Sequence, residues 1–194
     1  MIYESIVITE RGDGVPHIAP LGIREVEGLT LLAPFRPSTT LDNLTRSGCA
    51  VINFTDDVRV FAGCLSGRRE WPVRRAETIA GWVLEGALSH RELTVERLED
   101  DSTRPRFLCR EVYAATHGPF RGFNRAQAAV VEAAILVSRL HVLPADKIDR
   151  EIDYLRIAID KTAGPREREA WGWLLERIAE FRAEQARRNP PSYG

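Results

Sequence analysis

The sequence has few of the residues that build the best-known catalytic and metal-binding motifs. It contains only two lysines, Lys147 and Lys161, one methionine, and three cysteines without CxxC spacing. Its four histidines are scattered, with neither an HExxH nor an HxH arrangement, so we expect no metal site. GxSxG, GxxxxGK[ST] and GxGxxG are also absent, which argues against an α/β-hydrolase, a P-loop protein and a dinucleotide-binding Rossmann fold.

The sequence also has no excess of charge of one sign and no long hydrophobic run. Lys plus Arg number 27 and Asp plus Glu number 28, a net charge of −1 that disfavours broad nucleic-acid binding. The longest apolar stretch, residues 126–137, contains Gln127 and Glu132 and is too short and too polar to cross a bilayer. Charged residues from Glu4 onward leave no apolar core for a secretory leader. With cysteines expected to be reduced, these features predict a cytoplasmic protein.

The composition is that of a globular protein of 194 residues, with 44% hydrophobic and 28% charged residues. The first part of the chain predicts an antiparallel β unit the size of a barrel, with one short helix over residues 39–46. Strands are expected over residues 5–9, 15–23, 29–33, 49–54, 93–98 and 106–116. Residues 66–90 fit no single period.

The pattern changes from strands to helices after His117-Gly118-Pro119. Asn124 is a good N-cap for a helix to about residue 140, Pro144 ends it, and Gly164-Pro165 separates two further helices. The predicted fold class is therefore α+β: six antiparallel strands followed by a C-terminal helical segment. We expect a β domain at 1–118, a helical subdomain at 119–188 and a tail at 189–194.

A polar loop and a helix start form the first candidate site. Residues 36–44 read RPSTTLDNL, so hydroxyls, free backbone N–H groups and the helix dipole converge where a strand has just ended. Such a place binds phosphate well, and Arg36 can add a charge-assisted contact. The alternative interpretation is an ordinary Ser/Thr helix cap without a ligand.

The second candidate site is the segment PHIAPLG at residues 16–22. Small residues and two prolines leave the backbone uncovered, so a flat ring system can lie against residues 19–22, with His17 as a candidate histidine of the same cleft. The alternative is an edge strand that proline protects from aggregation.

The order of these elements resembles the FMN-binding split barrel of the flavin-reductase and pyridoxamine-phosphate-oxidase type. The segments PHIAPLGI, STTLDNL, VINFTDDV and FRGFNRAQAAVVEAAILVSRL resemble more closely one family of split-barrel flavoproteins, domain of unknown function 447. The resemblance covers nearly the whole chain. It implies a six-stranded antiparallel split β-barrel and a homodimer with FMN in a cleft near the subunit interface.

The resemblance also assigns cofactor contacts residue by residue, with no lysine near the phosphate loop. The phosphate is expected on Arg36, Ser38, Thr39 and Thr40, amide contacts from Asn43 and Asn53, and the isoalloxazine ring against Ala19, Pro20 and Gly22. The implied function is an FMN-dependent oxidoreductase or flavin reductase, with no catalytic acid or base assigned. The alternative is a non-catalytic flavin or pterin binding protein linked to one-carbon metabolism.

Charged residues recur every seven positions along the helix that begins after Asn124. Arg125, Glu132 and Arg139 lie near one face, and alanines leave room for close helix approach. Because seven residues span about 10.5 Å of helix, these charges are expected to meet partners on other helices or on the second subunit. The alternative is a solvated stripe on a packed helix.

Overall fold

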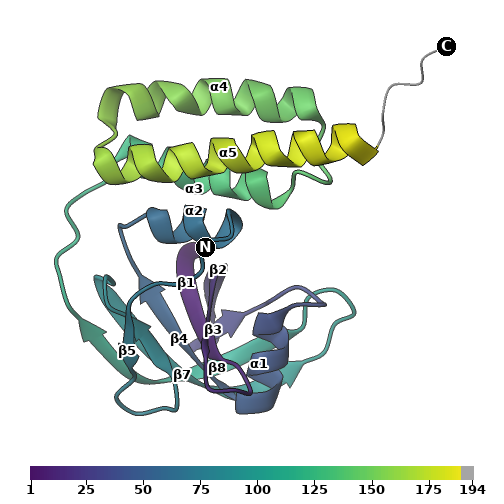
Figure 1. Ribbon diagram of the computed structural model, residues 1–194. Coiled ribbons are helices and arrows are strands. Elements are labelled where there is room, and N and C mark those ends of the chain that lie inside the picture. The colour runs from purple at the N-terminus through teal and green to yellow at the C-terminus, as the bar shows by residue number, and fades with distance from the viewer. Residues whose placement is uncertain (189–194) are drawn as a thin grey trace. The chain divides into compact units, whose positions relative to one another are not determined.

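The computed structural model describes residues 1–188 and divides them into two compact units (Figure 1). The barrel unit comprises residues 1–56 and 69–121, and the helical unit comprises residues 57–68 and 122–188. The predicted domain boundaries at residues 118 and 188 stay predictions, and the predicted tail at 189–194 lies outside the described residues. Within residues 1–188, no helix combines the length and apolar character that a bilayer-spanning segment needs.

Six antiparallel strands close the barrel, which confirms the predicted α+β class. They are β1 (Tyr3–Glu10), β2 (Pro16–Val26), β3 (Leu29–Leu32), β4 (Cys49–Phe54), β7 (Ser89–Glu99) and β8 (Arg106–Thr116), in the order β1-β2-β3-β8-β7-β4. The β2–β3 hairpin turns through Glu27 and Gly28, whose φ angles of 54° and 76° are those of a two-residue type I′ turn.

Helix α1 (Thr39–Ser47) contributes to the interior of the barrel. Leu41 and Leu44 join a buried cluster with strand residues that include Val7, Ile52 and Phe107. Gly48 ends the helix with a φ of 66°, a left-handed conformation that glycine adopts without steric cost. The chain then enters β4 directly, so α1 is fixed at both ends and packs against β1 and β2.

A second, two-stranded sheet covers part of the barrel's outer surface. It consists of β5 (Val73–Arg75) and β6 (Trp82–Leu84), and β6 packs against β1 and β4. Val83 and Leu84 are almost fully buried. Strands of three residues carry too few alternations to produce a readable period, which explains why residues 66–90 gave no prediction.

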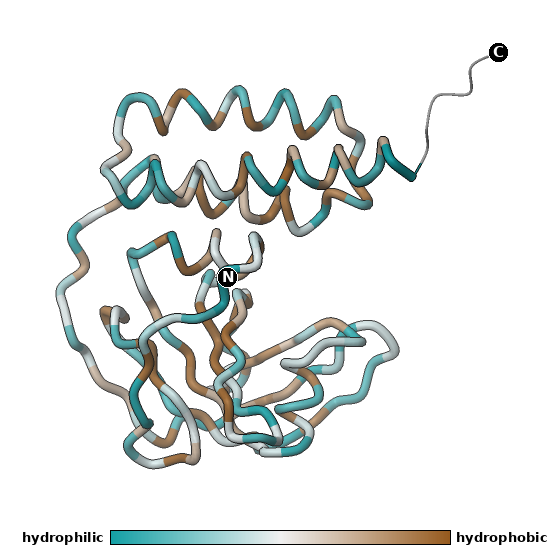
Figure 2. Tube along the Cα trace, in the orientation of Figure 1, coloured by the Kyte–Doolittle hydropathy of each residue, from teal (hydrophilic) through white to brown (hydrophobic). Residues whose placement is uncertain are grey.

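The helical unit contains α2 (Arg59–Leu65), α3 (Arg125–Ser138), α4 (Ala145–Thr162) and α5 (Pro165–Arg188). Ala62, Val130, Ala133 and Leu174 are fully buried in its core. Figure 2 shows hydrophobic and hydrophilic residues alternating along α4, as expected of a helix with one buried face. The three C-terminal helices were predicted from the sequence, whereas α2, which lies between barrel strands in the sequence, was not.

Candidate functional site

The loop after β3 leads into α1 and presents free backbone donors at the helix start. Ser38 has extended backbone angles, and its Oγ accepts a hydrogen bond from the N–H of Leu41 (3.2 Å). This bond satisfies the third N–H of the helix. The N–H groups of Thr39 and Thr40 have no partner among residues 1–188, as helix geometry requires of the first turn. Together with the dipole of the nine-residue helix, they form a favourable position for an anion.

The three hydroxyls of this loop have different roles. Ser38 is the helix cap, and its contact with a phosphate stays a prediction. The Thr39 side chain is exposed, and Thr40 is only 6% exposed. Within the described chain neither threonine hydroxyl takes part in a hydrogen bond, so both can still donate to a ligand. The structure thus leaves two hydroxyls and two N–H groups at one helix end.

Two arginines stand beside this loop, one of which the sequence did not point to. Arg36 is exposed and donates to Asp100 Oδ1 (2.8 Å), so part of its charge is already neutralised. Arg104 donates from both Nε (3.1 Å) and a terminal nitrogen (2.9 Å) to the carbonyl oxygen of Ala33, and lies over the ring of Phe35. Sequence reasoning missed Arg104 because only the fold brings the β7–β8 turn to this loop.

Arg104 is held in place by an acidic turn. Asp101 Oδ1 accepts the backbone N–H groups of Arg104 (2.6 Å) and Thr103 (2.8 Å), and these bonds hold the pKa of the Asp101 carboxyl below its usual value. The Thr103 carbonyl oxygen in turn accepts the N–H of Arg36 (2.9 Å). The turn therefore fixes both arginine-bearing segments relative to each other.

The PHIAPLG segment lies in β2 and has a strand on one side only. Residues 16–23 pair with β1, whereas β3 pairs with β2 only at Arg24, Glu25 and Val26. Pro16 and Pro20 have no N–H to offer to a further strand. Helix α1 packs against β1 and β2, and its Asn43 contacts Thr9, which pairs with His17 at the beginning of the uncovered edge, so α1 lies beside this edge.

The predicted ring-contact residues fall along this edge, with one distinction between them. Ala19 and Pro20 are half-buried and lie within the one-sided part of β2. Gly22 has a local reason to be glycine, because a Cβ there would lie 2.7 Å from Cγ2 of Ile2. Ile2 is 51% exposed, so its side chain has room to shift, and contact of Gly22 with a ring stays a prediction.

His17 begins the same edge, opposite Thr9 of β1. Burial lowers the pKa of its imidazole, and the nearby cations Arg69 and Arg11 lower it further. His17 is therefore neutral at pH 7 and can act only as a neutral donor or acceptor there.

The two predicted amide contacts are engaged inside the barrel. Asn43 Nδ2 donates to Thr9 Oγ1 (2.9 Å), and its side chain is buried. Asn53 is fully buried; its Nδ2 donates to the carbonyl oxygen of Ile6 (3.2 Å) and its Oδ1 accepts the N–H of Leu84 (2.9 Å). Asn53 thus ties β1, β4 and β6 together. A direct contact of either amide with a cofactor stays a prediction.

A further polar cluster, not found from the sequence, lies on the opposite face of β4 and β7 from the barrel core. The fully buried Glu92 accepts bonds from the N–H groups of Glu77 (2.6 Å) and Thr78 (2.7 Å) and from Thr78 Oγ1 (2.6 Å). Burial alone would raise the pKa of Glu92, but these bonds hold it below its usual value. His90 lies between Glu92 and His117, with 2.8 Å from its Nδ1 to His117 Nε2. This cluster fixes the chain between β5 and β6.

Comparison with known proteins supplies a family and a set of similar folds. A family model described as the N-terminal domain of protein of unknown function DUF447 matches residues 3–118, and a second DUF447 model matches residues 124–176. None of the curated protein sequences matches this chain.

Among solved structures, the FMN-bound protein MM1853 from Methanosarcina mazei, a DUF447 protein, has a TM-score of 0.80 at 21% identity. The similarity covers 91% of this chain and 94% of that one. Flavoredoxin from Methanosarcina acetivorans has a TM-score of 0.54 at 15% identity, over 60% of this chain and 69% of that one. BorF, the flavin reductase component of a bacterial two-component tryptophan halogenase, has a TM-score of 0.51 at 19% identity, over 61% and 82%. At these identities the likeness establishes a shared fold.

Proposed function

The chain belongs to the DUF447 protein family, and from this premise we propose that it is a flavoprotein that binds FMN with the cofactor's phosphate at the start of α1. The observation that carries the proposal is the pair of unpartnered N–H groups and free hydroxyls at Thr39 and Thr40. A similar fold that holds FMN, in the structure of MM1853, supports the same assignment.

The residues present fit the phosphate end of FMN. Thr39 and Thr40 would donate up to four hydrogen bonds, two from N–H groups and two from hydroxyls. Arg36 and Arg104 would supply positive charge from two segments that the Asp101 turn holds together. Since no lysine lies in this loop, bidentate guanidinium contacts would neutralise the charge of the phosphate. Ser38 would act indirectly, by keeping the helix start in shape.

The isoalloxazine ring would lie along the one-sided part of β2. Ala19 and Pro20 offer little side-chain bulk, so a planar ring can approach the backbone there. Asn43 would support this arrangement by holding Thr9, which pairs with His17 across the β1–β2 ladder.

We propose that the protein works as an oxidoreductase, with flavin reduction the reaction that its structural relatives favour. Bound FMN would supply the redox chemistry, and this chain would bind, orient and shield it. Adding NADH or NADPH to the FMN-loaded protein without oxygen should bleach the flavin's visible absorbance. If FMN binds but neither nicotinamide reduces it, the protein is a flavin-binding protein that does not use these donors.

The resemblance to split-barrel flavoproteins further predicts a homodimer with FMN near the subunit interface, in the cytoplasm. The six strands close the barrel, but residues 16–23 of β2 pair with a strand on one side only and leave an uncovered edge. Light scattering at micromolar concentration tests the dimer, which requires twice the chain mass of 21.8 kDa.

A further inference from the structure

One face of the helical unit combines an apolar groove with charges that have no partner. The groove, of about 260 Å³, runs between α3 and α4. Its lining comprises Arg125, Ala128, Ala129 and Glu132 of α3 and Tyr154, Leu155, Ile157 and Ala158 of α4. The four α3 residues are spaced i, i+3, i+4 and i+7, so they form one line along the helix.

Several apolar residues of this face are exposed, unlike the apolar residues in the core of the helical unit. Tyr154 is 74% exposed and Ile157 is 50% exposed, and Ala128 is also exposed. Adjacent large apolar side chains at such exposure are typical of a surface that another molecule covers.

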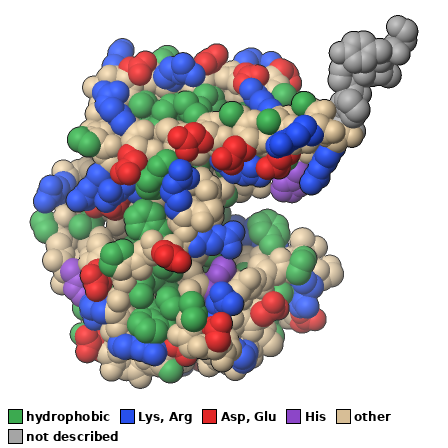
Figure 3. Space-filling view, in the orientation of Figure 1, with side chains coloured by type: hydrophobic (Ala, Val, Ile, Leu, Met, Phe, Trp, Pro, Cys, Tyr) green, Lys and Arg blue, Asp and Glu red, His purple; other side chains and the backbone are tan. Residues whose placement is uncertain are grey.

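The charges at the two ends of the α3 line are unpaired. Within residues 1–188, neither Arg125 nor Glu132 makes a hydrogen bond or an ion pair through its side chain. Figure 3 shows that acidic and basic side chains are interspersed over the visible surface. A cation and an anion on either side of two alanines form a charge pattern that a partner with the opposite charge order would complement.

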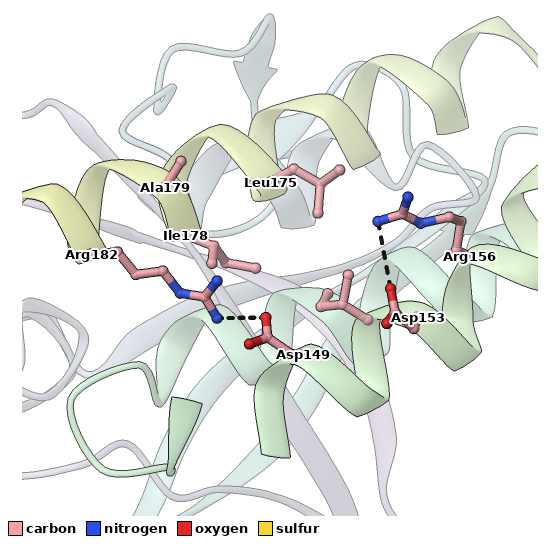
Figure 4. A pocket seen from close by; sticks show the side chains of 8 residues that line it. Asp149, Asp153, Arg156, Leu175, Ile178, Ala179 and Arg182 are labelled. Carbon is pink, nitrogen blue, oxygen red and sulfur yellow. Dashed lines mark hydrogen bonds and ion pairs between the residues drawn. The ribbon is translucent and has the colours of Figure 1, made fainter. Parts of the chain in front are cut away.

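The other groove of this unit provides the contrast. It has a volume of about 510 Å³ and lies between α4 and α5, and its charges pair with each other (Figure 4). Asp149 contacts Arg182 at 2.7 Å, and Asp153 contacts Arg156 at 3.7 Å. The charges of that groove pair within the chain, whereas within residues 1–188 those of the α3–α4 groove do not.

A second copy of the same chain supplies the matching order of charges. Arg125 and Glu132 are about 10.5 Å apart along the axis of α3, and their midpoint falls between Ala128 and Ala129. A two-fold axis through this point, perpendicular to α3, places Arg125 opposite the partner's Glu132 and Glu132 opposite the partner's Arg125. An interface of this isologous kind needs one surface that is complementary to itself, which this face is.

We propose that the α3–α4 face is an interface between two copies of this chain. The two α3 helices cross antiparallel at Ala128 and Ala129, whose small side chains allow close approach. Tyr154 and Ile157 of each copy then pack over the partner's α3, and two reciprocal Arg125–Glu132 pairs flank the axis. The inference rests on the predicted homodimer and not on flavin binding.

The test is the oligomeric state of the full chain, of three groove variants and of one control variant, measured by sedimentation velocity. Glu132→Arg and Arg125→Glu each set two pairs of like charges opposite one another, so each should raise the dimer dissociation constant by roughly 10- to 100-fold. The double variant Arg125→Glu/Glu132→Arg restores opposite charges and should return the constant to within a few-fold of the wild type. Arg139→Glu is the control, because Arg139, the C-cap residue of α3, is exposed and lies outside the groove, so this variant should leave the dimer dissociation constant unchanged.

The possible results distinguish the proposed interface from the predicted homodimer. A wild-type chain that is monomeric at micromolar concentration overturns this inference and the predicted homodimer together. A dimer that tolerates both single variants, or two dissociated single variants that the double variant does not restore, overturns the inference alone. Circular dichroism of each variant confirms that the helices remain folded. FMN titration of the same samples reports separately on the flavin site, so a failure to bind FMN bears only on the proposed function.

Discussion

Replacing Thr40 with valine tests the phosphate site with the least disturbance of the fold. The Thr40 side chain is 6% exposed, and its hydroxyl makes no hydrogen bond with the described part of the chain. Valine keeps the shape and removes only the hydroxyl, so the melting temperature should stay close to that of the wild type. A hydrogen bond to a charged phosphate contributes about 1.5–3 kcal/mol. At about 1.4 kcal/mol per tenfold, the FMN dissociation constant should rise by roughly 10- to 150-fold.

Riboflavin, which has no phosphate, is the control ligand for the same variant. Titration calorimetry should give an unchanged riboflavin affinity, so the loss appears only with FMN. Ser38→Ala is the matched second variant, because the Ser38 hydroxyl already caps the helix by accepting the N–H of Leu41. It should lower stability by about 1 kcal/mol and weaken FMN binding less than Thr40→Val does. Equal weakening of both flavins by Thr40→Val, or an unchanged FMN affinity, would refute the assignment of Thr40 to the phosphate.

Three further predictions concern stability. Glu92→Gln removes the charge that the loop N–H groups solvate and should lower the free energy of unfolding by about 3 kcal/mol in urea titrations; a neutral effect would contradict the buried network. Asn124→Ala removes the acceptor of two N–H groups at the start of α3 and should cost about 1 kcal/mol, whereas Asn124→Asp should retain most of that stability. Burial lowers the pKa of His17 and of His117, so the unfolded chain takes up protons first and stability should fall as pH drops below about 6.5. A His17→Gln/His117→Gln double variant that leaves this slope unchanged would falsify the assignment.

Much of the fold could be predicted because its long elements carry their own pattern. The strands of the barrel show apolar alternation or clear turn residues, and Asn124 and Ser38 mark helix starts that the structure confirms. The short elements could not be predicted. Helix α2 and strands β5 and β6 have three to seven residues and depend on packing against segments distant in sequence.

Some residues of the candidate site could likewise be predicted from the sequence, and others could not. The loop from Arg36 to Thr40 was found from the sequence because a helix start is a local feature. Arg104 and Glu92 were not found, since the guanidinium of Arg104 contacts Ala33 and the carboxylate of Glu92 accepts bonds from residues 77–79, all distant in sequence. Asn53 was predicted to contact the cofactor, but the structure shows that its side chain forms buried hydrogen bonds with Ile6 and Leu84. No sequence pattern reveals these bonds.

The most direct test of the account is the absorbance spectrum of the purified protein, followed by denaturation and mass spectrometry of the released ligand. The account predicts a yellow protein that releases FMN, with at most one FMN per chain. Protein that is purified colourless should take up FMN on titration and bind it more tightly than riboflavin. A colourless protein that binds no added FMN, or one that releases a flavin without phosphate and binds riboflavin equally well, would contradict the central claim.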